Sequence, residues 1–208
     1  SEFQGNSIAY RYASYSLDNL DVTVGNYYEQ FGSGLVFRTY ENKGLGVDNA
    51  MDGVRIKYNI LNSIDIKSFI GTSRTYLEYS DGIVRGIDVE TNLFELLALE
   101  KSTNLILGSS FVSRFQKDNN PKFNLPQNVG VYGLRSNLIS GNFNYYLEYV
   151  HKYNDPAGSI ADNSNNYATG NAIKTSLTYF QKGLGFSFDA HRVDNMEFRS
   201  ERQQSKEY

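Results

Sequence analysis

The feature that most constrains this chain is an alternation of apolar and polar residues with a period of two. In the run 143–149, the odd positions are Phe, Tyr, Leu and Tyr, and the even positions are Asn, Tyr and Glu. The runs 54–60, 173–179 and 184–191 follow the same rule. Successive side chains of a pleated strand point to opposite faces, so this pattern predicts strands with one apolar and one polar face. Helical spacing is hard to find, and the sequence therefore predicts an all-β protein.

The alternating runs are long. Strands of soluble proteins usually have ~5–6 residues, whereas a strand that crosses a membrane needs ~9–11. The long runs are 105–116, 129–139, 143–153, 171–180 and 184–193. Their length favours a membrane-spanning β-barrel over a soluble β-sandwich.

The connections between the runs support the same interpretation. Tight polar turns are expected at 61–63, 140–142 and 181–183, and longer polar stretches at 42–53, 73–82, 117–128 and 154–170. If 83–100 is one long strand that turns at 101–103, short and long connections alternate strictly from residue 42 onward. Short turns at one rim and long loops at the other are typical of an antiparallel up-and-down transmembrane β-barrel. Greek-key crossovers would not produce this alternation.

The composition agrees with strands that meet both lipid and water. The chain has 17 Tyr and 13 Phe but no Trp, and tyrosine combines an apolar ring with a polar tip. The mean hydropathy is -0.48. No stretch approaches the ~18–20 apolar residues of a membrane-spanning helix, which excludes a helical membrane protein.

Length and charge narrow the remaining classes. The 208 residues fit a single domain, 1–208, and the net charge of -3 argues against a nucleic-acid partner. There is no cysteine, so disulfides and thiolate chemistry are absent. Both ends look cut, and we expect a partial barrel with strands missing at one or both ends.

The polar positions of the predicted strands carry charges of both signs. We predict that these side chains face the lumen, because a charge on the lipid face costs ~2–4 kcal/mol at the midplane. The lumen-facing candidates are Arg55, Lys57, Asp65, Lys67, Arg85, Asp88, Glu90, Arg114, Glu148, Lys174 and Asp189. Glu95, Glu100 and Arg135 occupy similar positions. Because the signs are balanced, no preference for anions or cations follows.

Residues 29–41 interrupt the alternation with a Gly-Ser-Gly sequence and only a short strand-like run. One hypothesis is that this segment bends into the lumen as a constriction formed by Glu29, Arg38 and Glu41. The alternative, which the sequence favours, is a bulged strand, since glycine commonly marks bulges.

The sequence contains no complete motif for phosphate or metal binding. Gly32-Ser33-Gly34 lacks the Gly-Lys-Ser/Thr of a phosphate loop, and 48–59 has Ala and Asn where an EF-hand needs ligands. Asp155 and Asp162 could hold calcium only weakly, and a surface loop is the preferred interpretation. The histidines, His151 and His191, lack metal-ligand spacing and are expected near a rim. We predict no catalytic, cofactor or metal site, and no enzyme.

Several short blocks carry a resemblance to a known family. The blocks are 24–35, 38–41, 45–49, 81–88, 182–185 and 194–200. They are similar to an outer-membrane β-barrel family of the Bacteroidota, and the similarity covers most of residues 20–200. Members of that family are generally longer and have no established catalytic residues. The resemblance therefore implies a fold and a location, but no chemistry.

The sequence thus predicts an outer-membrane β-barrel protein. It would act as a passive pore or as a subunit of a larger uptake or secretion assembly, with outer-membrane lipid and other outer-membrane proteins as partners. A soluble secreted β-sheet adhesin or glycan-binding module is the main alternative, and an outer-membrane enzyme is a third.

Overall fold

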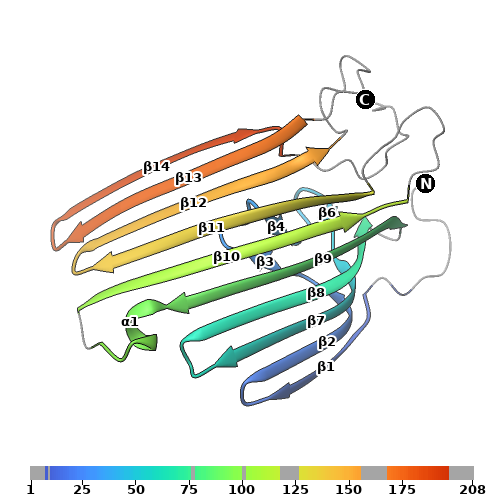
Figure 1. Cartoon of the computed structure of the whole chain (residues 1–208), viewed down its shortest axis with the longest axis horizontal. Coiled ribbons are helices and arrows are strands. Elements are labelled where there is room, and N and C mark those ends of the chain that lie inside the picture. The colour runs from blue at the N-terminus through green and yellow to red at the C-terminus, as the bar shows by residue number, and fades with distance from the viewer. Residues whose placement is uncertain are drawn as a thin grey trace.

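Ten strands lie side by side in one antiparallel sheet in the computed structural model of the chain (Figure 1). The structure describes residues 8, 10–75, 78–99, 102–117, 127–155 and 168–196. The strand order is β1-β2-β7-β8-β9-β10-β11-β12-β13-β14, so each strand pairs with its neighbours along the chain apart from the step from β2 to β7. The chain is therefore an all-β protein with an up-and-down sheet.

The bounds of the ten strands are β1 (Tyr12–Leu17), β2 (Leu20–Tyr27), β7 (Met51–Ile60), β8 (Ile64–Thr75), β9 (Glu78–Asn92), β10 (Thr103–Phe115), β11 (Asn128–Ser140), β12 (Phe143–Asp155), β13 (Ala168–Gln181) and β14 (Leu184–Asp194). The five long runs predicted from the alternation correspond to β10 through β14. Their existence and order are confirmed, with small differences at the ends.

Two predicted connections are wrong. Residues 83–100 do not form one strand, because β9 ends at Asn92 and a short helix, α1 (Leu93–Leu96), follows. The Asn92 side chain accepts a hydrogen bond from the backbone N–H of Glu95, which is the usual role of asparagine at a helix start. The polar stretch 73–82 is not a long loop, since Arg74 pairs with Tyr79 and Thr75 with Glu78 in the β8–β9 ladder.

These differences break the strict alternation of short and long connections. The β8–β9 connection is short where a long one was expected, and the β9–β10 connection contains α1 where a turn was expected. The turns at 61–63, 141–142 and 182–183 are confirmed, with positive φ at Leu61, Asn62, Gly141 and Gly183. Most of the predicted loops 117–128 and 154–170 lie outside the described residues.

The sheet is open. Strands β1 and β14 form its two edges, and no pairing joins them among the strands that the structure describes. A closed barrel is therefore not found, and closure remains a prediction. No helix in the described part of the chain is long and apolar enough to cross a membrane.

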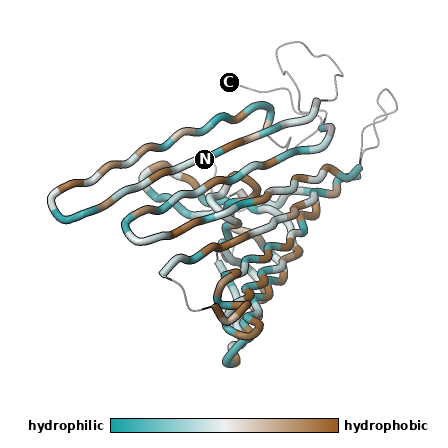
Figure 2. The backbone as a smooth tube through the Cα atoms, turned by 60° about the vertical axis from the view of Figure 1, so that its left-hand side comes forward, coloured by the Kyte–Doolittle hydropathy of each residue, from teal (hydrophilic) through white to brown (hydrophobic). Residues whose placement is uncertain are grey.

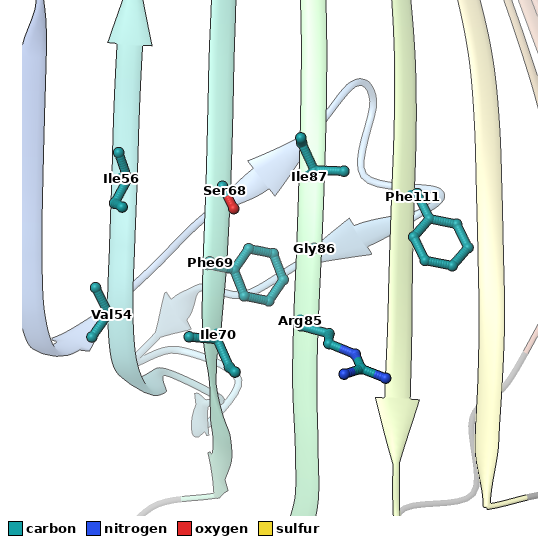
Figure 3. Close-up of a pocket in the computed structure, with 9 residues that line it drawn as sticks. All are labelled: Val54, Ile56, Ser68, Phe69, Ile70, Arg85, Gly86, Ile87 and Phe111. Carbon is teal, nitrogen blue, oxygen red and sulfur yellow. The ribbon is translucent and has the colours of Figure 1, made fainter.

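Residues 28–50, here called the inner segment, connect β2 to β7 and lie against one face of the sheet. The segment contains two short hairpins, β3 (Gln30–Phe31) with β4 (Phe37–Arg38), and β5 (Glu41–Asn42) with β6 (Val47–Asp48). Figure 3 is a view of the face that the segment does not cover, and it shows these hairpins behind the strands. Residues 29–41 are therefore not a bulged strand of the sheet, and that interpretation is wrong.

The inner segment defines two faces of the sheet. The face that it covers is called the inner face, and the other is called the outer face. A small apolar core forms between the segment and the inner face, consisting of Tyr27, Phe31, Val36, Met51, Phe69, Val112, Val131, Val150 and Ala172.

The apolar residues of the alternating runs lie elsewhere. Val24, Ile56, Leu134, Ile173 and Phe186 belong to the outer face and are exposed, with Leu134 55% and Phe186 54% accessible. Figure 2 shows hydrophobic and hydrophilic positions alternating along the strands. The alternation thus gives the sheet an exposed apolar face rather than a buried core.

Candidate functional site

The inner face collects most of the residues predicted to face a lumen. The pairing register places Arg55, Lys57, Asp65, Lys67, Asp88, Glu90, Arg114, Glu148, Lys174 and Asp189 on it. Glu95 lies instead in α1, and Glu100 lies outside the described residues.

Arg85 was predicted to face the lumen with this group, but its side chain lies on the outer face of the sheet. It pairs in register with Ile70 on β8 and Ser113 on β10, and both belong to the outer face. Arg85 is an odd number of residues from Asp88, so a regular strand must place the two side chains on opposite faces. Counting positions along the strand would have separated Arg85 from Asp88 and Glu90.

The first cluster on the inner face surrounds Glu29 of the inner segment. The Glu29 carboxylate lies 3.6 Å from Arg55 Nη1, 3.2 Å from Lys57 Nζ and 3.7 Å from Lys67 Nζ. Its side chain is only 5% exposed, whereas the side chains of Lys57 and Lys67 are about one-third exposed. One buried carboxylate of the inner segment thus faces three cations of β7 and β8.

Arg55 also fixes the beginning of the inner segment. Its Nη1 donates to the backbone oxygen of Tyr28 at 3.0 Å, and its Nη2 donates to Thr23 Oγ1 at 3.0 Å. The Arg55 side chain therefore joins β2, β7 and the inner segment.

The second cluster is centred on Arg135, which is buried on β11. Its guanidinium donates to both Asp88 oxygens at 2.7 and 3.0 Å, to Glu90 Oε2 at 2.8 and 3.0 Å, and to Ser110 Oγ at 2.8 Å. The forked guanidinium matches the carboxylates in a way that a lysine could not. Arg135 therefore holds β9, β10 and β11 together.

Gly108 makes room for this cluster. It pairs with Arg135 in register, and a Cβ atom at Gly108 would lie 2.4 Å from Arg135 Nε. The guanidinium can lie flat across β10 only because this position has no side chain.

Glu148 attaches the tip of the first hairpin. Its Oε2 accepts hydrogen bonds from the Ser33 backbone N–H at 3.2 Å and from the Tyr146 hydroxyl at 2.7 Å. The preceding residue, Gly32, has a φ of +52°, and a Cβ there would lie 2.6 Å from Glu148 Oε1. The Gly-Ser-Gly sequence thus forms the contact between the first hairpin and β12, and it is neither a phosphate loop nor a bulge.

Asp48 attaches the other end of the inner segment. It forms an ion pair with Arg74, which is almost fully buried, and accepts a hydrogen bond from the Tyr28 hydroxyl at 2.9 Å. Burial, together with this hydrogen bond, raises the pKa of Tyr28 well above its ordinary value. Asp48 therefore anchors the end of the inner segment to β8.

The two other constriction candidates are less constrained. The Arg38 guanidinium lies 4.5 Å from the centre of the Tyr40 ring, and Glu41 faces Lys43 at 4.0 Å on the surface. Of the three predicted residues, only Glu29 is buried among charges of the sheet.

Two hollows open on the inner face. One of 360 Å³ is lined by residues of the Arg135 and Glu148 region, including Ser33, Tyr146, Lys174 and Asp189. The other, of 380 Å³, lies beside β1 and is lined by Tyr10, Tyr12, Tyr28, Arg55 and Lys57 among others. Polar side chains dominate both, so the arrangement suits contact with water and polar solutes.

A metal centre is not formed by the described residues, where no group of three His, Cys, Asp or Glu side chains is suitably placed. His151 shares a hydrogen bond with Asn171 on the outer face at 2.7 Å, and His191 lies on the inner face of β14. Asp162 lies outside the described residues, so the weak calcium site is not tested.

Fold and site together define a class: an all-β protein with an open antiparallel sheet, an exposed apolar face, and a charged face covered in part by a segment of the same chain. The chain belongs to the DUF6029 family, described as a family of unknown function, whose model matches residues 1–208. No curated protein and no solved structure matches it. The resemblance to outer-membrane barrels of the Bacteroidota stays a prediction.

Proposed function

We propose that this chain forms part of the wall of an outer-membrane β-barrel. In this proposal the outer face meets hydrocarbon, and the inner face surrounds a lumen that the inner segment narrows. The observation that carries the proposal is the contrast between an exposed apolar outer face and an inner face that holds buried charges.

The exposed apolar side chains of the outer face support the proposal. Monomeric soluble proteins rarely expose apolar patches of more than a few hundred Å². Large apolar side chains are exposed on the outer face of successive strands, including Val24, Ile56, Ile70, Ile87, Leu107, Phe111, Leu134, Tyr149, Ile173 and Phe188. A hydrocarbon environment would remove this surface from water.

The stagger of the strands supports a tilted barrel wall. Ile60 and Ile64 flank the turn between β7 and β8 and begin a row of register partners. The same row continues through Thr91, Leu107, Ser136, Leu147 and Thr175 to Ala190, well inside β14. The row that starts beside a turn thus ends in the middle of β14. A sheet of tilted strands needs such a shift of register from strand to strand in order to close into a barrel.

Aromatic side chains lie toward both ends of the outer face. Phe143, Tyr179 and Phe186 are register partners beside the turns at 141–142 and 182–183. Tyr132 and Tyr153 are grouped near the opposite ends of β11 and β12, with their ring centres 5.8 Å apart. Two aromatic girdles that flank an aliphatic band are typical of outer-membrane barrels.

Two roles follow for such a barrel, a passive pore or a subunit of a larger uptake or secretion assembly. The buried attachments of Glu29, Ser33 and Asp48 favour a segment that stays in place and narrows the lumen.

Reconstitution of the purified protein in planar bilayers separates the two roles, because only a pore gives conductance without partners. Deletion of 29–41 should raise that conductance, and an unchanged value would count against the constriction.

A second candidate function is a secreted glycan-binding module. The tyrosine-lined hollow beside β1 favours it, since Tyr10, Tyr12 and Tyr28 line this hollow together with Ser14 and Ser16. Such a protein would be extracted from cells without detergent, whereas a barrel would require it.

A further inference from the structure

The outer face carries a hollow that the proposed lumen does not use. It has a volume of 360 Å³ and is lined by Val54, Ile56, Ser68, Phe69, Ile70, Arg85, Gly86, Ile87 and Phe111 (Figure 3). Apart from Ser68 and Arg85, its lining is apolar or glycine. The hollow is therefore an apolar recess with a single charge.

A small side chain creates this recess. Ser68 is flanked in register by Ile56 on β7 and Ile87 on β9, and Phe111 follows on β10. A serine in a row of large residues leaves space between the neighbouring side chains. The recess extends along the strands from the row of Ile70 and Arg85 to the row of Ile56 and Ile87.

Arg85 marks one end of the recess. Its Nε donates to Ser113 Oγ at 3.0 Å, and its Nη2 donates to Asn128 Oδ1 at 3.1 Å. Asn128 is the first residue of β11, so the guanidinium reaches toward an end of the sheet. These contacts orient the guanidinium and leave donors for an anion.

We propose that this recess holds an acyl chain of an acidic phospholipid while Arg85 binds the phosphate of the headgroup. The inference rests on the proposed function, because it requires the outer face to meet a bilayer. A cation on the hydrocarbon face costs ~2–4 kcal/mol at the midplane but ~0–1 kcal/mol near the interface. A phosphate beside the guanidinium offsets this cost, and an apolar recess below it accepts the chain.

The test uses the absence of tryptophan from the chain. Phe111→Trp places the only tryptophan at the recess, where bromine atoms on a bound acyl chain would quench its fluorescence. The protein is reconstituted in phosphatidylcholine vesicles, and brominated phosphatidylglycerol or brominated phosphatidylcholine is added. We expect brominated phosphatidylglycerol to quench at about fivefold lower mole fraction, since one cation attracts an acidic lipid to about that extent.

Variants in the Phe111→Trp background identify the cause of this preference. Arg85→Gln should bring the two lipids to about equal quenching. Arg192→Gln is the matched control, because Arg192 lies on the outer face beside Ile173 but does not line the recess. It should leave the preference unchanged. Ser68→Leu fills the recess and should reduce quenching by both lipids, which keeps the test decisive if Arg85→Gln does not fold.

Each outcome has a distinct meaning. Equal quenching by the two lipids in the parent, or the same preference in Arg85→Gln and Arg192→Gln, would overturn the acidic-lipid site while the membrane location stands. Quenching by neither lipid would show that Phe111 does not meet acyl chains and would contradict the proposed function itself.

Discussion

The two faces of the sheet are built from the same strands but organised in opposite ways. On the inner face, charges are buried and paired, as in the contacts of Arg135 with Asp88 and Glu90. On the outer face, large apolar side chains stand exposed and cover no core. In a soluble protein the arrangement would be reversed. The difference supports the proposal that the outer face meets hydrocarbon, and it shows that buried charge pairs organise part of the inner face.

The largest effect is expected from Arg135→Met. This change leaves Asp88 and Glu90 without their cation, and removal of one partner of a buried ion pair typically costs ~3–5 kcal/mol. Urea unfolding followed by circular dichroism would measure the loss of unfolding free energy. Lys174→Met on the same face is the control and should cost less than about 1 kcal/mol. Equal losses would mean that buried pairing does not organise the inner face.

A lysine introduced on the outer face should have the next largest effect. Leu177→Lys, between Tyr145 and Phe188 on the outer face, places a cation where the account puts hydrocarbon, at a cost of ~2–4 kcal/mol in vesicles. Ser176→Lys, next to it on the same strand, faces Asp189 on the inner face and should be tolerated. Unfolding titrations in lipid vesicles would compare the two variants. If the outer face met water, Leu177→Lys would change stability by only about 0.5 kcal/mol.

Glu29→Gln tests how the inner segment is held. The amide cannot balance Arg55, Lys57 and Lys67, and we expect a local loss of about 1–3 kcal/mol. Hydrogen exchange of the amides in 28–41 should quicken accordingly, with the sheet unaffected. Glu41→Gln is the matched control, because its pair with Lys43 lies on the surface. Equal exchange in the two variants would remove Glu29 as the anchor.

The smallest effect is expected from Tyr28→Phe, on the stability of the protein at alkaline pH. The pKa of Tyr28 is higher in the folded protein than its ordinary value of 10.0, because of burial and its hydrogen bond to Asp48. Its contribution to stability is therefore present below the unfolded pKa and lost as pH rises toward the folded pKa. Tyr28→Phe should show a slightly shallower loss of stability between about pH 9 and 11 than the parent protein. Identical slopes would contradict this role.

Much of the sheet could be predicted from the sequence because the alternation is local and repeated. Strands β10 to β14 follow from it directly. The helix α1 was missed because its signal is a single asparagine cap at Asn92, within a run that looks like a strand. Strands β8 and β9 continue through polar residues, where pairing of the backbone matters more than the side chains.

The candidate site was predicted only in part. Alternation identified the charged positions of the inner face, and strand counting would have corrected Arg85. The contacts of the inner segment were not predictable, since Glu29 meets β7 and β8 and Ser33 meets Glu148, more than a hundred residues away. Such contacts depend on how the segment lies across the sheet, which no local pattern encodes.

The central claim is that the outer face meets hydrocarbon and the inner face meets water. The chain has no cysteine, so a single cysteine can be introduced at Leu134 or Ile173 on the outer face and at Ser176 or Lys57 on the inner face. Each is labelled with a polarity-sensitive fluorophore in lipid vesicles containing a nitroxide-labelled lipid. The account predicts blue-shifted, strongly quenched emission at Leu134 and Ile173 and water-like, unquenched emission at Ser176 and Lys57. Water-like, unquenched emission at all four positions would contradict it.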